Sequence, residues 1–156
     1  MAPGEPTDVV AWATELLEMA RVGRMGLLDE EGAPRVLPVT FVVAEGLIWS
    51  AIDQKPKRAE EPARLRFLRR DARAALTVDR YSDDWEELKW VQVLGRVRIL
   101  DLPEGAAGLR ALSAKYEQYL EQPPPGPLLA LRPERYLWWR AADPEGRGGR
   151  SRGPGG

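Results

Sequence analysis

The chain has 156 residues, 44% of them hydrophobic, which is enough for one domain with its own core. Its 23 Lys and Arg residues nearly balance 24 Asp and Glu residues, and the net charge of −1 gives no general attraction to nucleic acid or to an anionic membrane. Cys and His are both absent, which excludes disulfides, thiolate nucleophiles, histidine triads and the commonest metal ligands. We therefore predict no nucleic-acid, membrane or metal partner.

The first half of the chain predicts one helix followed by three strands. Apolar residues recur at helical spacing over about 8–22, and β-rich runs follow at 24–29, 35–43 and 47–52. The first two runs are joined by "EEGAP", which suits a hairpin connection. Pro38 lies inside the second run and cannot donate to a strand ladder, so that strand is expected at a sheet edge or a bulge.

The second half of the chain alternates helices and strands. The expected elements are a short helix at 60–70, strands at 73–79 and 89–100, a helix at about 103–120 and a last strand at about 134–142. Leu65 and Leu68 are expected to face the core from the short helix. Gly95 is expected to mark a bulge or a bend in the longest strand.

This order of elements predicts an α+β fold with a six-stranded, mostly antiparallel sheet and flanking helices. Three consecutive strands joined by hairpin-length turns cannot be parallel, and six such strands could close into a small barrel. The folded domain is expected to cover residues 1–142. The tail, 143–156, has almost nothing to bury, so we expect it to be disordered and assign it no role. The N-terminus lacks the layout of a signal peptide and no apolar run is long enough to span a membrane, so a cytoplasmic protein is expected.

Conventional catalytic motifs are missing from the chain. It has no glycine-rich phosphate loop ending in Gly-Lys-Ser/Thr, no dinucleotide fingerprint and no serine flanked by glycines as in hydrolases. Any chemistry would therefore depend on a bound cofactor.

Lys55, Lys57 and Arg58, which we call the basic cluster, place three positive charges within four positions. Such charges repel one another and oppose the dipole of the helix that follows, and a bound phosphate would offset both effects. Pro56 stiffens the segment between the two lysines. The alternative interpretation is a solvated loop whose charges are answered by the two glutamates that follow.

The strand just before the basic cluster, "LIWSAI", alternates so that Trp49 and Ala51 share one face and Ser50 lies on the other. It therefore offers small groups, next to the charges, against which a flat ring could lie. Further along, Trp85 and Trp90 bracket the acidic loop "DDWEELKW". Core packing explains Trp90, and Trp85 is expected at a dimer contact or a pocket wall.

Three motifs carry a family resemblance that spans about residues 20–140: Gly-x-Pro-Arg-Val-x-Pro-Val, Asp-x-Lys-Pro-Lys-Arg, and Asp-Asp-Trp before a Trp-containing strand with its Gly-Arg. Together they resemble the pyridoxamine 5'-phosphate oxidase-like split β-barrel flavoproteins, and within them most closely the branch of oxidoreductases that use the deazaflavin coenzyme F420. The resemblance implies a homodimer with two cofactor sites at the subunit interface. The chain lacks the full Arg-Lys phosphate signature and the His-bearing substrate site of the oxidase itself, so oxidation of pyridoxamine phosphate is not expected.

The same resemblance assigns roles to individual positions. Lys57 matches the family lysine on the cofactor phosphate, and Lys55 matches the basic residue two positions before it. The strand end beside the phosphate and ring, and the strand running along the ring, correspond to Ser50, Ala51, Pro38, Val39 and Thr40. Arg58 is added to the phosphate site on charge geometry alone.

The leading functional hypothesis is F420-dependent reduction of a small unsaturated organic molecule, with Trp85, Trp90 and Arg96 as candidates for the acceptor side. FMN in the same fold is the first alternative, because both cofactors present a tricyclic ring and a phosphate. A non-catalytic cofactor carrier or sensor is the second alternative, because tight binding without an acceptor pocket would leave the same marks in the sequence.

Overall fold

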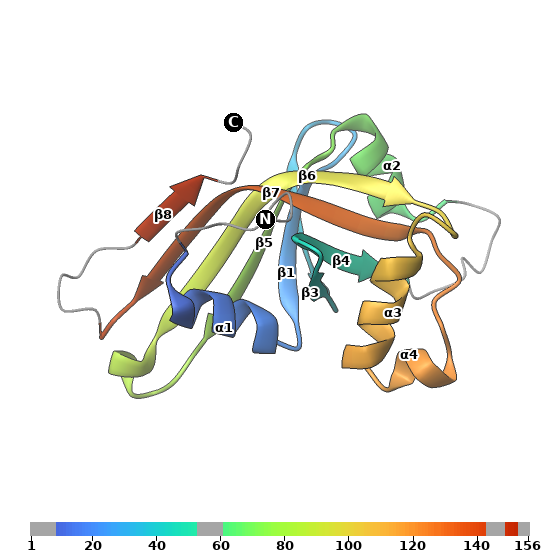
Figure 1. Ribbon diagram of the computed structural model, residues 1–156. Helices are drawn as coiled ribbons and strands as arrows, with labels where there is room; N and C mark the ends of the chain where they lie inside the picture. Colours follow the sequence, from blue (N-terminus) through green and yellow to red (C-terminus); the bar gives the residue numbers. More distant parts are fainter. Residues whose placement is uncertain (1–8, 53–60, 143–148, 153–156) are drawn as a thin grey trace.

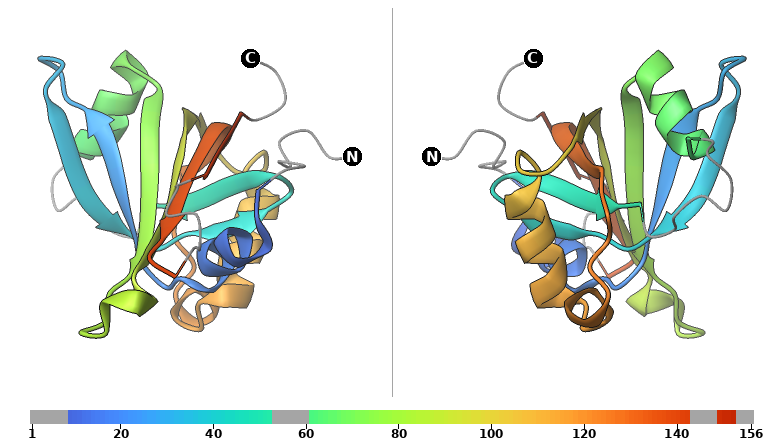
Figure 2. Two further views of the ribbon diagram at one scale, coloured as in Figure 1. Left: turned by 90° about the vertical axis from the view of Figure 1, so that its left-hand side faces the viewer. Right: turned by 90° about the vertical axis from the view of Figure 1, so that its right-hand side faces the viewer.

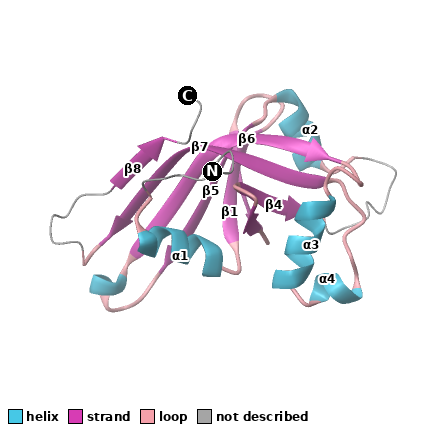
Figure 3. Cartoon of the chain, in the orientation of Figure 1, coloured by secondary structure: helices cyan, strands magenta, loops and turns pink. Residues whose placement is uncertain are grey.

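The computed structural model describes residues 9–52, 61–142 and 149–152 (Figures 1 and 3). The helices are α1 (Ala11–Met19), α2 (Ala63–Arg70), α3 (Ala106–Lys115) and α4 (Gln118–Glu121), with a single 3-10 turn, η1, at Trp85–Glu87. The strands are β1 (Gly23–Leu28), β2 (Pro34–Val39), β3 (Val42–Ala44), β4 (Leu47–Ala51), β5 (Arg73–Arg80), β6 (Lys89–Leu100), β7 (Leu128–Arg140) and β8 (Gly149–Arg152).

All eight described strands belong to one antiparallel sheet in the order β2-β1-β5-β6-β7-β4-β3, with β8 paired to β7. The predicted α+β class with an antiparallel sheet and flanking helices is confirmed, but the predicted count of six strands is wrong. The run 35–43 divides into β2 and β3, because the chain turns a corner at Thr40 and Phe41. Residues 149–152, placed in the predicted disordered tail, pair with β7 through the backbone and form β8.

Pro38 lies on β2, which is one edge of the sheet, so the prediction from its missing donor is confirmed. The strand order ends on the other side at β3, the next strand in the chain, and β8 adds a further edge beside β7. The two ends of the strand order, β2 and β3, are thus consecutive strands that meet at the Thr40–Phe41 corner. This arrangement is consistent with a split barrel.

The longest strand, β7, begins at Leu128. The start near residue 134 that the sequence predicts is therefore too late. Its first residues are buried and pair on one side with β6 and on the other with β4, so non-local pairing extends the strand across Pro133. The register shifts opposite Gly95, which confirms the predicted bulge. A Cβ at Gly95 would overlap the carbonyl oxygen of Arg132, so only glycine fits this crossing.

Two apolar clusters hold the helices to the sheet. The first lies under α1 and α2 and includes Leu65 and Leu68, which confirms the predicted core face of the short helix. The second packs α3 and α4 against β4 and includes Trp49 and Leu112. A Cβ at Gly108 would overlap the Trp49 ring, so this glycine sets how closely α3 approaches the sheet. Figures 1 and 2 show α2 near the upper end of the strands, with α1, α3 and α4 near the lower end.

The predicted helix at 103–120 is divided at Tyr116, whose backbone is extended (φ −118°, ψ 112°). The Tyr116 hydroxyl bonds to backbone groups of Arg21 and Phe41, far away in the sequence, so tertiary contacts accompany the break. Among the described residues, no helix has the length and apolar character needed to cross a bilayer.

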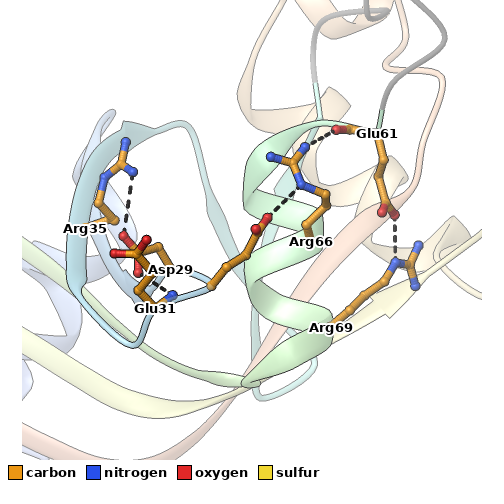
Figure 4. A network of polar contacts seen from close by, with 7 residues as sticks. Asp29, Glu31, Arg35, Glu61, Arg66 and Arg69 are labelled. Carbon is orange, nitrogen blue, oxygen red and sulfur yellow. Dashed lines mark hydrogen bonds and ion pairs between the residues drawn. The ribbon is translucent and has the colours of Figure 1, made fainter.

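One exposed ion pair joins α2 to the β1–β2 hairpin, and a second joins α2 to the segment just before it (Figure 4). Arg66 Nε donates to Glu30 Oε1 over 2.9 Å, and Arg69 Nε donates to Glu61 Oε1 over 2.6 Å. The turn itself is closed by Asp29, whose carboxylate accepts from the backbone N–H groups of residues 31 and 33. Each exposed pair contributes little alone, and the Arg66–Glu30 pair is the one that joins the hairpin to the helix that begins just after the basic cluster in sequence.

Candidate functional site

A groove of about 190 Å³ lies where the end of β2 meets the end of β4. We call it the β4 groove. Its lining consists of Val22, Pro38, Val39, Thr40, Ser50, Ala51 and Arg64. The structure therefore brings together all five of the described residues that the sequence assigned to cofactor binding, although they come from two separate strands.

The Ser50 side chain joins the two strands that form the groove. It is only 2% exposed, and its hydroxyl donates a hydrogen bond of 2.8 Å to the carbonyl oxygen of Thr40. Thr40 Oγ1 in turn lies 2.7 Å from the hydroxyl of Tyr119 on α4. Because the Ser50 proton is committed to Thr40, the side chain can only accept a hydrogen bond from a ligand.

Tyr116 holds the same corner from beneath. Its hydroxyl accepts from the backbone N–H of Phe41 over 3.1 Å and lies 2.8 Å and 2.9 Å from the carbonyl oxygens of Phe41 and Arg21. Burial raises the pKa of Tyr116, so the hydroxyl stays protonated and can donate at neutral pH. The corner that ends β2 is thus fixed by hydrogen bonds and not by strand pairing alone.

Two cations stand behind this corner. Lys115 Nζ donates to the carbonyl oxygen of Ala20 over 2.7 Å and lies 4.3 Å from the centre of the Phe41 ring. Burial, and then the nearby charge of Arg21, lower the pKa of Lys115 to about 8. The Arg21 guanidinium lies 4.6 Å from the Tyr116 ring centre and donates to the Lys115 carbonyl oxygen. The corner behind the groove is therefore positively charged at neutral pH.

Arg64 is the one charged side chain in the described lining of the groove. It is half-buried, and it makes no ion pair or hydrogen bond with any residue that the structure describes. It lies in the first turn of α2, where a cation opposes the helix dipole. Sequence reasoning missed Arg64, but this unfavourable position of a cation is a signal that could have found it.

The basic cluster lies outside the described residues, so the positions of Lys55, Lys57 and Arg58 stay predictions. The groove nevertheless contains residues from both flanks of that segment, Ala51 before it and Arg64 after it. Any anion held by Arg64 would thus bind at the place where the segment leaves and rejoins the described fold.

The three acceptor-side candidates do not line the β4 groove within one chain. Trp85 lies in η1 and is 70% exposed. Trp90 is half-buried on β6, where it pairs with Trp139 of β7. Arg96 is exposed further along β6, and its Nε lies 3.2 Å from Glu134 Oε1.

The family model described as pyridoxamine 5'-phosphate oxidase matches residues 12–140, which is most of the chain. The chain belongs to the pyridoxamine 5'-phosphate oxidase family. The resemblance inferred from the sequence motifs is thereby confirmed at the level of the family and its flavoprotein-type fold. A search of curated proteins finds no match.

Solved structures support the family fold. This member of the family is similar to a conserved hypothetical protein, Rv2991, from Mycobacterium tuberculosis, with 17% identity, a TM-score of 0.71 and 90% of each chain covered. It is also similar to a FAD-binding protein from Mesorhizobium loti (20% identity, TM-score 0.62, 92% of this chain and 95% of the other). A haem-binding protein from Mycobacterium smegmatis matches at 21% identity and a TM-score of 0.64, covering 94% of this chain and 60% of that one. At these identities the likeness concerns the fold alone.

Proposed function

We propose that this protein is a cytoplasmic, homodimeric oxidoreductase that binds the deazaflavin F420 in the β4 groove and reduces a small unsaturated organic molecule. The observation that carries the proposal is the convergence of Pro38, Val39, Thr40, Ser50 and Ala51 around one groove that also holds Arg64. Membership of a family with a flavoprotein-type fold supports a planar, phosphorylated ligand.

The groove residues divide the work between charge and shape. Arg64, with Lys55, Lys57 and Arg58 of the basic cluster, would bind the cofactor phosphate, because guanidinium and ammonium groups make charge-assisted hydrogen bonds to phosphate. Apolar walls from both strands would support the ring. The hydroxyl oxygen of Ser50 would accept a hydrogen bond, since its own proton is taken by Thr40.

When bound, such a ring supplies hydride transfer, so the chain needs no nucleophile of its own. Its residues would hold the ring, exclude water from it and orient the acceptor. The lack of Cys and His in the chain is compatible with this division of tasks.

A second subunit forms part of the proposal. The groove of about 190 Å³ is smaller than the roughly 300 to 1,000 Å³ typical of ligand pockets, so one described chain supplies only part of a site for a tricyclic ring. We expect a second copy to supply the missing wall and to bring acceptor-side residues to it, with Trp85, Trp90 and Arg96 as the candidates.

Titration of the purified protein with F420 and with FMN, followed by fluorescence quenching, tests the proposal and separates the two cofactors. Lys57→Ala, alone and with Lys55→Ala, should make the free energy of cofactor binding less favourable by about 1.5 to 3 kcal/mol for each charge-assisted hydrogen bond that the substitution removes. Arg110→Ala is the matched control, because it removes one exposed positive charge from α3, away from the groove. If the double variant bound the cofactor with unchanged affinity, the basic cluster would be interpreted as a solvated loop that does not bind the phosphate.

Hydride transfer is tested separately, by mixing the reduced cofactor with a panel of unsaturated acceptors and following its reoxidation. Turnover with any acceptor supports the oxidoreductase. Tight binding with no turnover on the whole panel would favour the carrier or sensor.

A further inference from the structure

A second and larger cavity, of about 340 Å³, lies at the other end of β4. We call it the hairpin pocket, because the turn of the β3–β4 hairpin forms one wall, α1 forms another, and β6 and β7 form the floor. In Figure 2, α1 lies beside this hairpin. The pocket shares no lining residue with the β4 groove. Its volume falls within the range typical of small-molecule sites.

The floor of the hairpin pocket includes Tyr136, whose hydroxyl has no hydrogen-bond partner among the described residues. Tyr136 is 5% exposed, and its hydroxyl makes no hydrogen bond within the described part of the chain. Burial raises the pKa of Tyr136 to about 12, so this group is a neutral donor at any physiological pH. Among the described residues, Arg140 Nε is the fully enclosed side-chain polar atom that lacks a partner, so the Tyr136 hydroxyl counts as a donor open to a ligand and not as an orphaned buried group.

The charges of the hairpin pocket have one sign. Glu18 on α1 and Glu45 in the hairpin turn are exposed lining residues, and no Lys or Arg belongs to the described lining. The remaining walls are mainly apolar, and they include Ala13, Leu17, Val43, Ile48 and Val91. An anion such as a flavin phosphate would be repelled here, whereas a cation with an apolar body would be favoured.

We propose that the hairpin pocket binds a small organic cation whose apolar body carries a hydrogen-bond acceptor. Tyr136 donates to the acceptor, the apolar walls cover the body, and Glu18 and Glu45 attract the charged end. The site is independent of the cofactor proposed for the β4 groove.

Calorimetric titration with three probes of one shape tests the proposal. The probes are 4-acetylbenzylamine, neutral 4-methylacetophenone and anionic 4-acetylbenzoate, which share a ketone oxygen and differ in charge. We expect the amine to bind most tightly, the neutral ketone less tightly and the benzoate not at all. If the amine fails to bind the folded wild-type protein, or the benzoate binds as well as the amine, the proposal is overturned.

Two sets of variants locate the binding. Tyr136→Phe keeps the ring and should lower the affinity for the amine by about 3- to 10-fold, which is the usual effect of one net hydrogen bond. The double variant Glu18→Gln, Glu45→Gln should lower the affinity for the amine by about 2- to 5-fold for each charge removed and leave the affinity for the neutral ketone unchanged. Glu15→Gln is the control, since this exposed carboxylate of α1 is not part of the lining. Equal amine affinity in wild type and Tyr136→Phe, with both variants folded by thermal melting, would contradict the assignment.

Discussion

Strand β4 ends in two sites of opposite character. At its C-terminal end, Ser50 and Ala51 line the β4 groove, where the Ser50 hydroxyl is hydrogen-bonded and the described charge is the positive Arg64. At its N-terminal end, Leu47 and Ile48 line the hairpin pocket, where the described charges are carboxylates. The five residues of β4 lie between the two sites. Each face of the strand is covered by one of the apolar clusters, and this keeps the two environments apart.

Two buried tyrosines make the contrast measurable. Tyr116 beside the groove has three backbone partners for its hydroxyl, whereas Tyr136 in the hairpin pocket has none in the described part of the chain. The first hydroxyl is part of the framework of its site. The second is available to a ligand.

The largest effect is expected where α3 packs against the middle of β4. Gly108→Ala would drive a Cβ into the Trp49 ring, and we expect a loss of about 3 kcal/mol in the free energy of unfolding, the upper end of overpacking costs. This exceeds the roughly 1 kcal/mol that alanine gains over glycine in a helix. Denaturant unfolding of the wild type and Gly108→Ala measures this difference in the free energy of unfolding. Gly26→Ala is the control, since its Cβ would meet only the Ala75 Cβ at 3.9 Å; equal stability of the two variants would contradict the packing.

Tyr116→Phe should break the framework of the groove. The buried N–H of Phe41 loses its acceptor, and the carbonyl oxygen that receives the single hydroxyl proton loses its donor, so we expect a loss of about 2 kcal/mol in the free energy of unfolding. Tyr81→Phe, at an exposed tyrosine, should change stability by less than about 0.5 kcal/mol. A wild-type melting curve for Tyr116→Phe would show that the corner does not need these bonds.

The charge behind the corner should appear as a dependence of stability on pH. Folded Lys115 has its pKa lowered from 10.5 to about 8, so between these values the unfolded chain binds more protons than the folded chain. The free energy of unfolding of the wild type should therefore rise with pH across this window, relative to Lys115→Met. Denaturant unfolding of both proteins from about pH 7 to 10.5 measures the difference. A constant difference would mean that the Lys115 ammonium is as well hydrated in the folded protein as in the unfolded chain.

The smallest effect is expected at the hairpin pocket. Tyr136→Phe removes a hydroxyl that has no described partner, so stability should stay within about 0.5 kcal/mol of wild type or rise slightly. Tyr-to-Phe substitution should therefore destabilise the protein at Tyr116 and leave its stability nearly unchanged at Tyr136. A loss above about 1 kcal/mol at Tyr136 would reveal a hydrogen bond inside the protein and remove the contrast.

The elements with a local cause could be predicted from the sequence. Alternation of apolar and polar residues predicted the bounds of β6. The missing N–H donor of Pro38 predicted that β2 lies at an edge, and Gly95 predicted the bulge. The split between β2 and β3, the early start of β7 and the break at Tyr116 could not be predicted. Each accompanies partners far along the chain, as in the bond between Phe41 and Tyr116 across 75 residues.

The candidate sites divide in the same way. The family resemblance identified five residues of the β4 groove, but gave no sign of Arg64 or of the tyrosines that hold the corner. The hairpin pocket left no local pattern at all, because Glu18, Glu45 and Tyr136 come from three distant elements and meet only in the fold.

The most direct test of the central claim is a fluorescence-quenching titration of F420 into the wild type, Arg64→Ala and Tyr136→Phe. If an anionic ring cofactor occupies the β4 groove, Arg64→Ala should weaken binding by about 10- to 150-fold, and Tyr136→Phe should leave it unchanged. FMN in place of F420 should show the same ranking if it is the cofactor. Equal affinity of wild type and Arg64→Ala for both cofactors, or no binding of either, would contradict the account.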